Sequence, residues 1–202
     1  MKYKCITGGP ISENCYLLID EKTNQAAVVD PGFLNDVLLN EIKKYTVQRI
    51  LLTHGHFDHI WEADRLHEML GVPVCAYKTE AAFAADDKQN GSLLMMYESI
   101  TCKVHEAFKD GETFQNGEVP VTVLHTPGHT AGGVSYITPD AVFTGDTLMG
   151  YSVGRCDLPT GNSAELRESL KKLAALPGNP DICGGHGPVT TLEDEKRRNP
   201  YL

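Results

Sequence analysis

Short apolar runs that stop at glycine-rich turns recur along the whole chain. Runs of this length predict β-strands. The expected strands lie at about Tyr3–Thr7, Tyr16–Asp20, Ala26–Asp30, Arg49–Thr53, Val74–Ala76, Val121–His125, Val134–Ile137, Val142–Thr144 and Ile182–Gly184. Apolar residues at helical spacing predict helices at about Asn35–Tyr45, Ile60–Leu70, Ser163–Leu176 and Leu192–Asn199. Strands and helices mixed in this way over the chain predict an α/β protein.

Nothing in the sequence marks a boundary between two domains. The composition does not change abruptly along the chain, and no low-complexity segment or short repeat occurs. The polar segment Asp86–Ser92 is predicted to be a surface loop, and Lys109–Glu118 a turn-rich connection. We therefore expect one domain that spans residues 1–202.

The densest group of chemically active side chains lies in the heptapeptide Thr53-His-Gly-His-Phe-Asp-His59. Imidazole nitrogens and carboxylate oxygens are ligand types preferred by zinc and by several other first-row metals. The heptapeptide follows a predicted strand and precedes a predicted helix, and Gly55 lets the backbone turn sharply between them. Ligands on such a connection can converge on one point, so the heptapeptide predicts a metal site.

Three later turns contain further candidate ligands, each at the end of an apolar run. His129 lies in Thr126-Pro-Gly-His-Thr130, Asp146 in Thr144-Gly-Asp-Thr147 and His186 in Gly184-Gly-His-Gly-Pro188. Functional residues gather on loops that a rigid scaffold holds in place, so this recurrence favours one shared site. The remaining histidines are interpreted as ordinary helix, loop and strand-end residues: His67, His105 and His125.

The order of these motifs resembles the metallo-β-lactamase superfamily, and within it the short hydrolases similar to glyoxalase II, the hydroxyacylglutathione hydrolases. Asn14-Cys-Tyr-Leu17 and Val29-Asp-Pro-Gly32 match the same family. The resemblance covers nearly the whole chain. It implies an αββα sandwich in which two mixed sheets pack back to back with helices outside, and a two-metal site at one edge.

The resemblance also implies a role for each candidate ligand in this chain. The first metal would be held by His54, His56 and His129, the second by Asp58, His59 and His186, and Asp146 would bridge them. We assign catalytic roles to Asp58 and Asp146 as well. Two divalent ions are expected, zinc in the first place, with iron or manganese as alternatives because His/Asp sites accept all three. Such a pair would lower the pKa of a shared water and provide hydroxide that attacks a carbonyl carbon.

The substrate is less closely defined by the sequence. Glyoxalase II adds a helical carboxy-terminal domain that helps to bind glutathione, whereas here only residues 187–202 follow His186, so we expect that domain to be absent. Arg155, in Gly154-Arg-Cys-Asp157, stands where glyoxalase II has a basic residue that contacts glutathione. It is expected either to bind a substrate carboxylate or to pair with Asp157 or another acid and order the loop.

These observations predict a two-metal hydrolase that cleaves a small thioester, such as S-D-lactoylglutathione, by attack of metal-bound hydroxide. The main alternative is a persulfide dioxygenase, which the family resemblance also allows. It would use one iron held by two histidines and an aspartate, here His54, His129 and Asp146. A lactonase or another ester hydrolase, and a non-catalytic binding module, are further alternatives.

The net charge and the cysteine content of the chain indicate which binding partners and which cellular compartment to expect. Eighteen basic and 27 acidic residues give a formal charge of −9, which disfavours a nucleic-acid partner. Six cysteines without a CxxC pair, and no secretory signal, predict reduced thiols in the cytoplasm. Cys183 is interpreted as an apolar core residue. No segment has transmembrane length, so no membrane partner is expected; the oligomeric state is left open.

Overall fold

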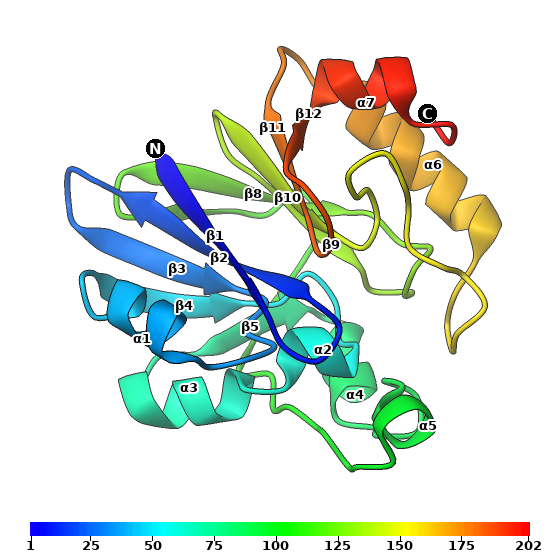
Figure 1. Cartoon of the computed structure of the whole chain (residues 1–202). Coiled ribbons are helices and arrows are strands. Elements are labelled where there is room, and N and C mark those ends of the chain that lie inside the picture. Colours follow the sequence, from blue (N-terminus) through cyan, green and yellow to red (C-terminus); the bar gives the residue numbers. More distant parts are fainter.

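Two six-stranded β-sheets pack back to back (Figure 1). The computed structural model describes residues 1–202. In spatial order the first sheet contains β1 (Lys2–Gly8), β2 (Glu13–Asp20), β3 (Gln25–Val29), β4 (Thr46–Leu51), β5 (Val74–Tyr77) and β6 (Glu106–Phe108). The second sheet contains β12 (Thr190–Thr191), β11 (Asp181–Gly184), β10 (Ala141–Gly145), β9 (Val134–Ile137), β8 (Val119–His125) and β7 (Thr113–Asn116). Both sheets are mixed, since β3 to β6 are parallel and β10 is parallel to β11.

Helices cover the two outer faces (Figure 1). The first sheet is covered by α1 (Asp36–Ile42) and α3 (Ala63–Leu70), and the second by α6 (Ser163–Ala174) and α7 (Leu192–Arg198). Three short helices lie together at one end of the first sheet: α2 (Phe57–Ile60), α4 (Glu80–Ala84) and α5 (Ser92–Met96). Asn162 caps α6, because its side-chain oxygen accepts hydrogen bonds from the Ala164 and Glu165 amides in the first turn.

The apolar side chains form three layers that match this order of elements. On β2, Leu17 packs in the layer between the first sheet and its helices, whereas Leu18 packs between the two sheets. All eight residues of β2 are buried, as expected of a strand covered on both faces. A third layer lies between the second sheet and α6 and α7. The αββα architecture predicted from the sequence is confirmed.

Several short elements differ from the sequence predictions. The Lys109–Glu118 connection contains β7, an edge strand with mainly polar residues, so its sequence has no apolar run. The Asp86–Ser92 segment is not wholly a surface loop, because Asn90 is fully buried and its side chain donates hydrogen bonds to two backbone carbonyls. The predicted helix Ile60–Leu70 is divided between α2 and α3. The short elements α4, α5, β6 and β12 were not predicted.

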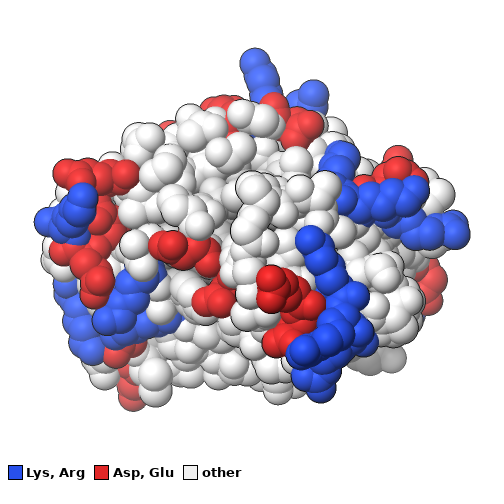
Figure 2. Space-filling view, turned by 90° about the horizontal axis from the view of Figure 1, so that it is seen from above, with Lys and Arg blue, Asp and Glu red and all other residues white.

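The distribution of surface charge and the length of the helices bear on whether the protein could bind nucleic acid or span a membrane. On the face seen in Figure 2, acidic and basic side chains lie among one another and no continuous basic surface is visible. None of the helices combines the length and the apolar character needed to cross a membrane. The absence of a nucleic-acid partner therefore stays a prediction that rests on the net charge of −9.

Candidate metal centre

The seven predicted ligands come from four connections that end at the same edge of the two sheets. His54 and His56 follow β4, whereas Asp58 and His59 lie on α2, immediately after them. The others follow strands of the second sheet: His129 after β8, Asp146 after β10 and His186 after β11. Parallel strands such as β10 and β11 present their carboxyl ends at one edge, and this brings residues far apart in the sequence together.

These residues form two groups with the geometry of metal sites. Ring nitrogens of His54, His56 and His129 lie within 4.8 Å of one another. Ligand atoms of Asp58, His59 and His186 form the second group within the same limit. The structure therefore brings together the residues that the sequence assigned to each metal.

Asp146 lies between the two groups. One of its carboxylate oxygens is 3.5 Å from His59 Nε2, and the other is 3.5 Å from His129 Nε2. One oxygen therefore faces His59 of the second group, and the other faces both groups, since it also lies 3.8 Å from His186 Nε2. This is the position that a bridging ligand needs, and the bridging role itself stays a proposal.

Buried polar atoms without partners test whether the centre fits metal ions. His54 Nε2, His59 Nε2 and Asp146 Oδ1 are buried and make no hydrogen bond of normal geometry, although His59 Nε2 lies 3.3 Å from Asp58 Oδ2 and 3.5 Å from Asp146 Oδ1. An unsatisfied buried polar group costs about 1–3 kcal/mol, so three in one place call for a ligand that they share. Imidazole nitrogens and a carboxylate oxygen are donors suited to divalent first-row metals, and the centre therefore fits such ions.

The opposite nitrogens of these histidine rings are held by oxygen atoms. His59 Nδ1 is 3.0 Å from Asp30 Oδ2, and His129 Nδ1 is 2.7 Å from the Arg155 carbonyl oxygen. His54 Nδ1 is 3.1 Å from the Thr53 hydroxyl, which itself donates to Asp30. An acceptor at Nδ1 keeps the proton there and leaves the Nε2 lone pair free to bind a metal. The surroundings therefore select the ring form that a metal site requires.

Two buried carboxylates that support the centre were not identified from the sequence. Asp30 contacts His59 and Thr53, and although Val29-Asp-Pro-Gly32 had been matched to the family, it had been given no role. Glu80, on α4, accepts hydrogen bonds from the Gly55 amide at 2.7 Å and the Gly132 amide at 2.8 Å. It thereby joins the loop of His54 and His56 to the loop that follows His129. Its sequence surroundings carry no motif that could have revealed this contact.

The two groups differ in their electrostatics. Burial, and then the neighbouring His59, lower the pKa of His54 well below its usual value. Burial also lowers the pKa of His56, to about 3, and His129 adds to this effect. Burial alone would lower the pKa of His59, but Asp58, Asp146 and Asp30 raise it well above the usual range. His54 and His56 are therefore neutral near pH 7, as metal ligation requires, and the carboxylates around His59 supply negative charge that would balance bound cations.

A cavity of about 210 Å³ opens onto both groups. Its polar lining includes His56, Asp58, His129, Asp146 and His186, and its remaining walls are mainly apolar: Ile11, Phe57, Met95, Met149, Gly154 and Leu158. Arg155 also reaches the cavity. A small substrate placed here would contact the candidate ligands and would be partly shielded from water by the apolar walls.

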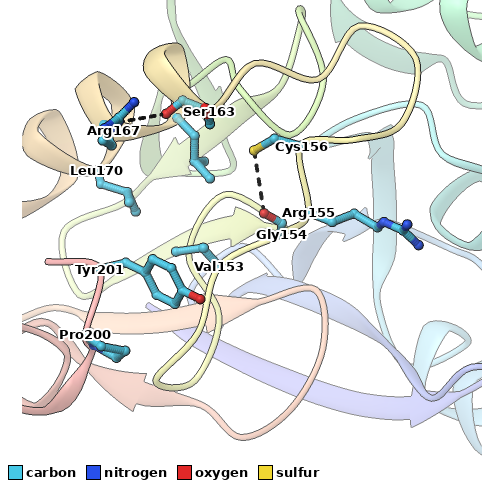
Figure 3. A pocket seen from close by; sticks show the side chains of 10 residues that line it. Val153, Gly154, Arg155, Cys156, Ser163, Arg167, Leu170, Pro200 and Tyr201 are labelled. Atoms are coloured by element: carbon cyan, nitrogen blue, oxygen red, sulfur yellow. Dashed lines mark hydrogen bonds between the residues drawn. The ribbon is translucent and has the colours of Figure 1, made fainter.

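Arg155 forms a two-point ion pair with Asp157. Its Nε is 2.6 Å from Asp157 Oδ1 and its second guanidinium nitrogen is 2.7 Å from Oδ2, with both side chains exposed. Figure 3 draws a second cavity, which lies between α6 and Val153–Cys156, and the Arg155 side chain extends away from it. Of the two expectations for Arg155, the structure contains the internal pair; substrate binding stays a prediction.

The other histidines and the cysteines lie outside the centre, as interpreted from the sequence. His67 and His105 stack on each other at 3.9 Å, and His125 stacks on Tyr77 at 4.2 Å. All six cysteines are free thiols, and Cys183 is buried between the sheets. None of them joins the two ligand groups.

Removal of metal is expected to lower the thermal stability of the protein strongly. A ligand that binds the native state at a thousand times its dissociation constant stabilises it by about 4 kcal/mol. For a chain of this size, full chelation should then lower Tm by about 10 °C. Differential scanning calorimetry with and without a chelator measures this, and restoration of Tm by added zinc, iron or manganese is the control. An unchanged Tm in protein proven to be metal-loaded would contradict the fit of the centre to metal.

Comparison with known proteins agrees with this geometry. The profile of the Metallo-beta-lactamase superfamily matches residues 8–186. The "Probable metallo-hydrolase YqgX" of Bacillus subtilis is 37% identical, with 100% of this chain and 98% of the relative covered. The "Hydroxyacylglutathione hydrolase GloC" of Haemophilus influenzae is 31% identical over 100% of this chain and 98% of its own.

Three solved structures extend the comparison. The BLEG-1 B3 metallo-beta-lactamase has a TM-score of 0.93 and 34% identity, with 100% of this chain and 99% of that chain covered. TTHA1623 in a di-iron-bound form has a TM-score of 0.84 and 34% identity over 98% of this chain and 100% of its own. ETHE1 from Myxococcus xanthus has a TM-score of 0.81 and 30% identity, with 99% of this chain and 84% of that chain covered.

Proposed function

The chain belongs to the metallo-beta-lactamase superfamily, and from this premise we propose that it hydrolyses a small thioester of the S-D-lactoylglutathione type, using two divalent metal ions. Family and centre together indicate a metal-dependent hydrolase with a His/Asp site. The observation that carries the two-metal proposal is the pair of complete ligand groups that meet at Asp146. Zinc, iron and manganese all suit these donors. The di-iron form of TTHA1623 supports iron as an alternative to zinc.

The choice of a thioester is supported by the relatives and by the second ligand group. The GloC relative is named a hydroxyacylglutathione hydrolase. Asp58 completes the second group, where lactamase-type sites commonly use a cysteine, and none of the six cysteines of this chain lies there. This favours a thioester over a β-lactam, although the similar BLEG-1 is a B3 metallo-beta-lactamase.

In the proposed hydrolysis, different groups of the centre would bind metal, balance its charge, orient the histidine rings and exclude water. Metal ions bound here would supply Lewis acidity and an acidified water. Asp146 faces both groups and would place a negative charge between two cations, which reduces their repulsion. Asp30 and the Arg155 carbonyl keep the protons on the outer nitrogens of His59 and His129, so that both rings stay correctly oriented. The apolar cavity walls would shield the reacting carbonyl from bulk water.

The persulfide dioxygenase alternative needs fewer residues than the structure assembles. One iron would require His54, His129 and Asp146 alone. The second group, with His186 Nε2 at 3.1 Å from Asp58 Oδ2, would then have no function. Because Asp58 and His59 are buried and their ligand atoms converge with that of His186, the structure favours the two-metal hydrolase.

The proposed function is tested with three substrates on one preparation of metal-loaded protein. We expect rapid thiol release from S-D-lactoylglutathione, no oxygen uptake with glutathione persulfide, and slow or no opening of a chromogenic cephalosporin. Oxygen uptake with glutathione persulfide, without cleavage of S-D-lactoylglutathione, would establish the dioxygenase instead. Faster turnover of the cephalosporin than of S-D-lactoylglutathione would overturn the proposal that the substrate is a thioester.

Removal of the Asp157 carboxylate is expected to strengthen binding of anionic thioesters. In Asp157→Asn the Arg155 guanidinium loses its charged partner and can pair with a substrate carboxylate, a modest gain because the site is exposed and screened by solvent. KM for glutathione thioesters should fall about three- to fivefold, and Arg155→Ala should raise it. Steady-state kinetics with an uncharged thioester is the control, for which neither change should alter KM. Equal effects on both substrates would assign the ion pair to loop order alone.

A further inference from the structure

Exposed apolar side chains gather beside the mouth of the metal-site cavity. Ile11 and Met95 line the cavity and are also 42% and 44% exposed. Leu94, at 65%, and Tyr97, at 90%, lie on and directly after the same helix, α5. A cluster of large apolar groups in water is unfavourable unless something covers it, and such surfaces commonly mark binding sites. We call Ile11, Leu94, Met95 and Tyr97 the apolar rim.

The rim is fixed to the metal-binding segment. The Phe57 amide, next to Asp58, donates to the Asn90 carbonyl at 3.1 Å. The Asn90 side chain in turn donates to the Ile100 carbonyl at 2.7 Å, so the residues on either side of α5 are tied together. α5 stands at the end of the molecule where α2 and α4 also lie (Figure 1). The rim is therefore held in a fixed relation to the centre.

A larger neighbouring cavity, of about 710 Å³, has no candidate metal ligand in its lining. It lies between α6 and the segment Val153–Cys156, with Leu170 and Tyr201 among its walls (Figure 3). The Gly154 amide donates to the Asp146 carbonyl at 2.7 Å, and the Arg155 carbonyl accepts from His129. A Cβ at Gly154 would stand 2.6 Å from His129 Nδ1, so the backbone itself fills this space. Met95 lines the metal-site cavity itself, so we take the course past Met95 as the path for a substrate whose carbonyl is at the centre.

We propose that the apolar rim binds an apolar acyl chain of the substrate, and that the enzyme prefers thioesters with acyl groups longer than lactoyl. This inference rests on the proposed thioester hydrolysis. The cavity of about 210 Å³ has Ile11 and Met95 in its lining, so an acyl chain too long for it would leave past these two side chains. Leu94 and Tyr97 lie on and directly after the same helix, α5, where the chain would continue. Each methylene group buried there should raise kcat/KM by about threefold until the rim is covered.

The test compares a rim variant with a matched control across a series of glutathione thioesters. The rim variant is Leu94→Ser/Met95→Ser. The control is Met69→Ser, which removes a methionine that is 52% exposed on α3, outside the cavity lining. kcat/KM is measured from acetyl to octanoyl, with the aggregation state determined by sedimentation at the assay concentration. We expect the octanoyl-to-acetyl ratio of the native chain to exceed about thirtyfold, to fall at least tenfold in the rim variant, and to persist in the control.

Different failures are distinguishable. If the native chain cleaves every thioester at a similar rate, or the ratio survives in the rim variant, the rim inference is overturned while thioester hydrolysis stands. If no thioester is cleaved by metal-loaded protein, the proposed function fails and the inference falls with it. If the native chain is a dimer that the rim variant converts to a monomer, the rim is an interface between copies and the acyl-binding role is overturned.

Discussion

The Asp146→Asn variant is expected to bind at most one metal ion per chain and to lose at least about a thousandfold in kcat/KM, because a metal contributes several kcal/mol to the barrier. The two oxygens of the native carboxylate lie 3.5 Å from His59 Nε2 and from His129 Nε2, which belong to different ligand groups. The neutral amide would remove the negative charge between two cations, and its nitrogen cannot bind a metal as the oxygen does. Metal analysis of the purified variant together with thioester kinetics measures both effects.

A second aspartate provides the control for this change. Asp140 is exposed, lies just before β10, and takes no part in the ligand groups. Asp140→Asn should therefore keep both metals and nearly normal turnover. Full metal occupancy and normal turnover in Asp146→Asn itself would refute the bridging assignment.

Glu80→Ala should produce the second large loss, in stability as well as in activity. The buried carboxylate accepts two backbone amide hydrogen bonds, from Gly55 and Gly132. Its removal leaves both amides unsatisfied at about 1–3 kcal/mol each, so the free energy of unfolding should fall by about 3–5 kcal/mol. The loops that carry His56 and His129 would no longer be tied together, and metal affinity should fall about 10- to 100-fold.

Denaturant unfolding and metal titration of Glu80→Ala test this expectation. Glu112→Ala is a matched control, since Glu112 also accepts a backbone amide hydrogen bond, from Lys109, but on the exposed surface. It should change stability by less than about 0.5 kcal/mol and leave metal affinity unchanged. If the Glu80 variant were as stable and as metal-tight as the Glu112 variant, Glu80 would have no supporting role.

The ligand groups could be anticipated because their signals are local. Each candidate ligand follows an apolar run that stops at a glycine-rich turn, as at Gly145-Asp146 and Gly185-His186. Gly185 also shows why the turn needs glycine, since a Cβ there would collide with the Asp146 carboxylate. The fold and the superfamily followed from the order of these turns and are confirmed. The glyoxalase II-like subtype, the single-domain extent and the ligand roles stay predictions.

The supporting residues could not be anticipated, because their function depends on distant contacts. Glu80 acts on amides 25 and 52 positions away, and nothing in its own segment distinguishes it from a surface glutamate. Asp30 lies 29 positions from the His59 ring that it holds. The missed strands β6 and β7 are short and partly exposed, so they lack the apolar runs from which strands were predicted. For Arg155 the sequence left two partners open, and only coordinates could show the pair with Asp157.

The central claim, a hydrolase with two cooperating metal ions, is tested most directly by titrating metal-free protein with zinc, iron or manganese while measuring bound metal and thioester cleavage together. We expect activity to stay low at one equivalent and to reach its maximum at two per chain. Maximal thioester cleavage at one equivalent of metal per chain would contradict it.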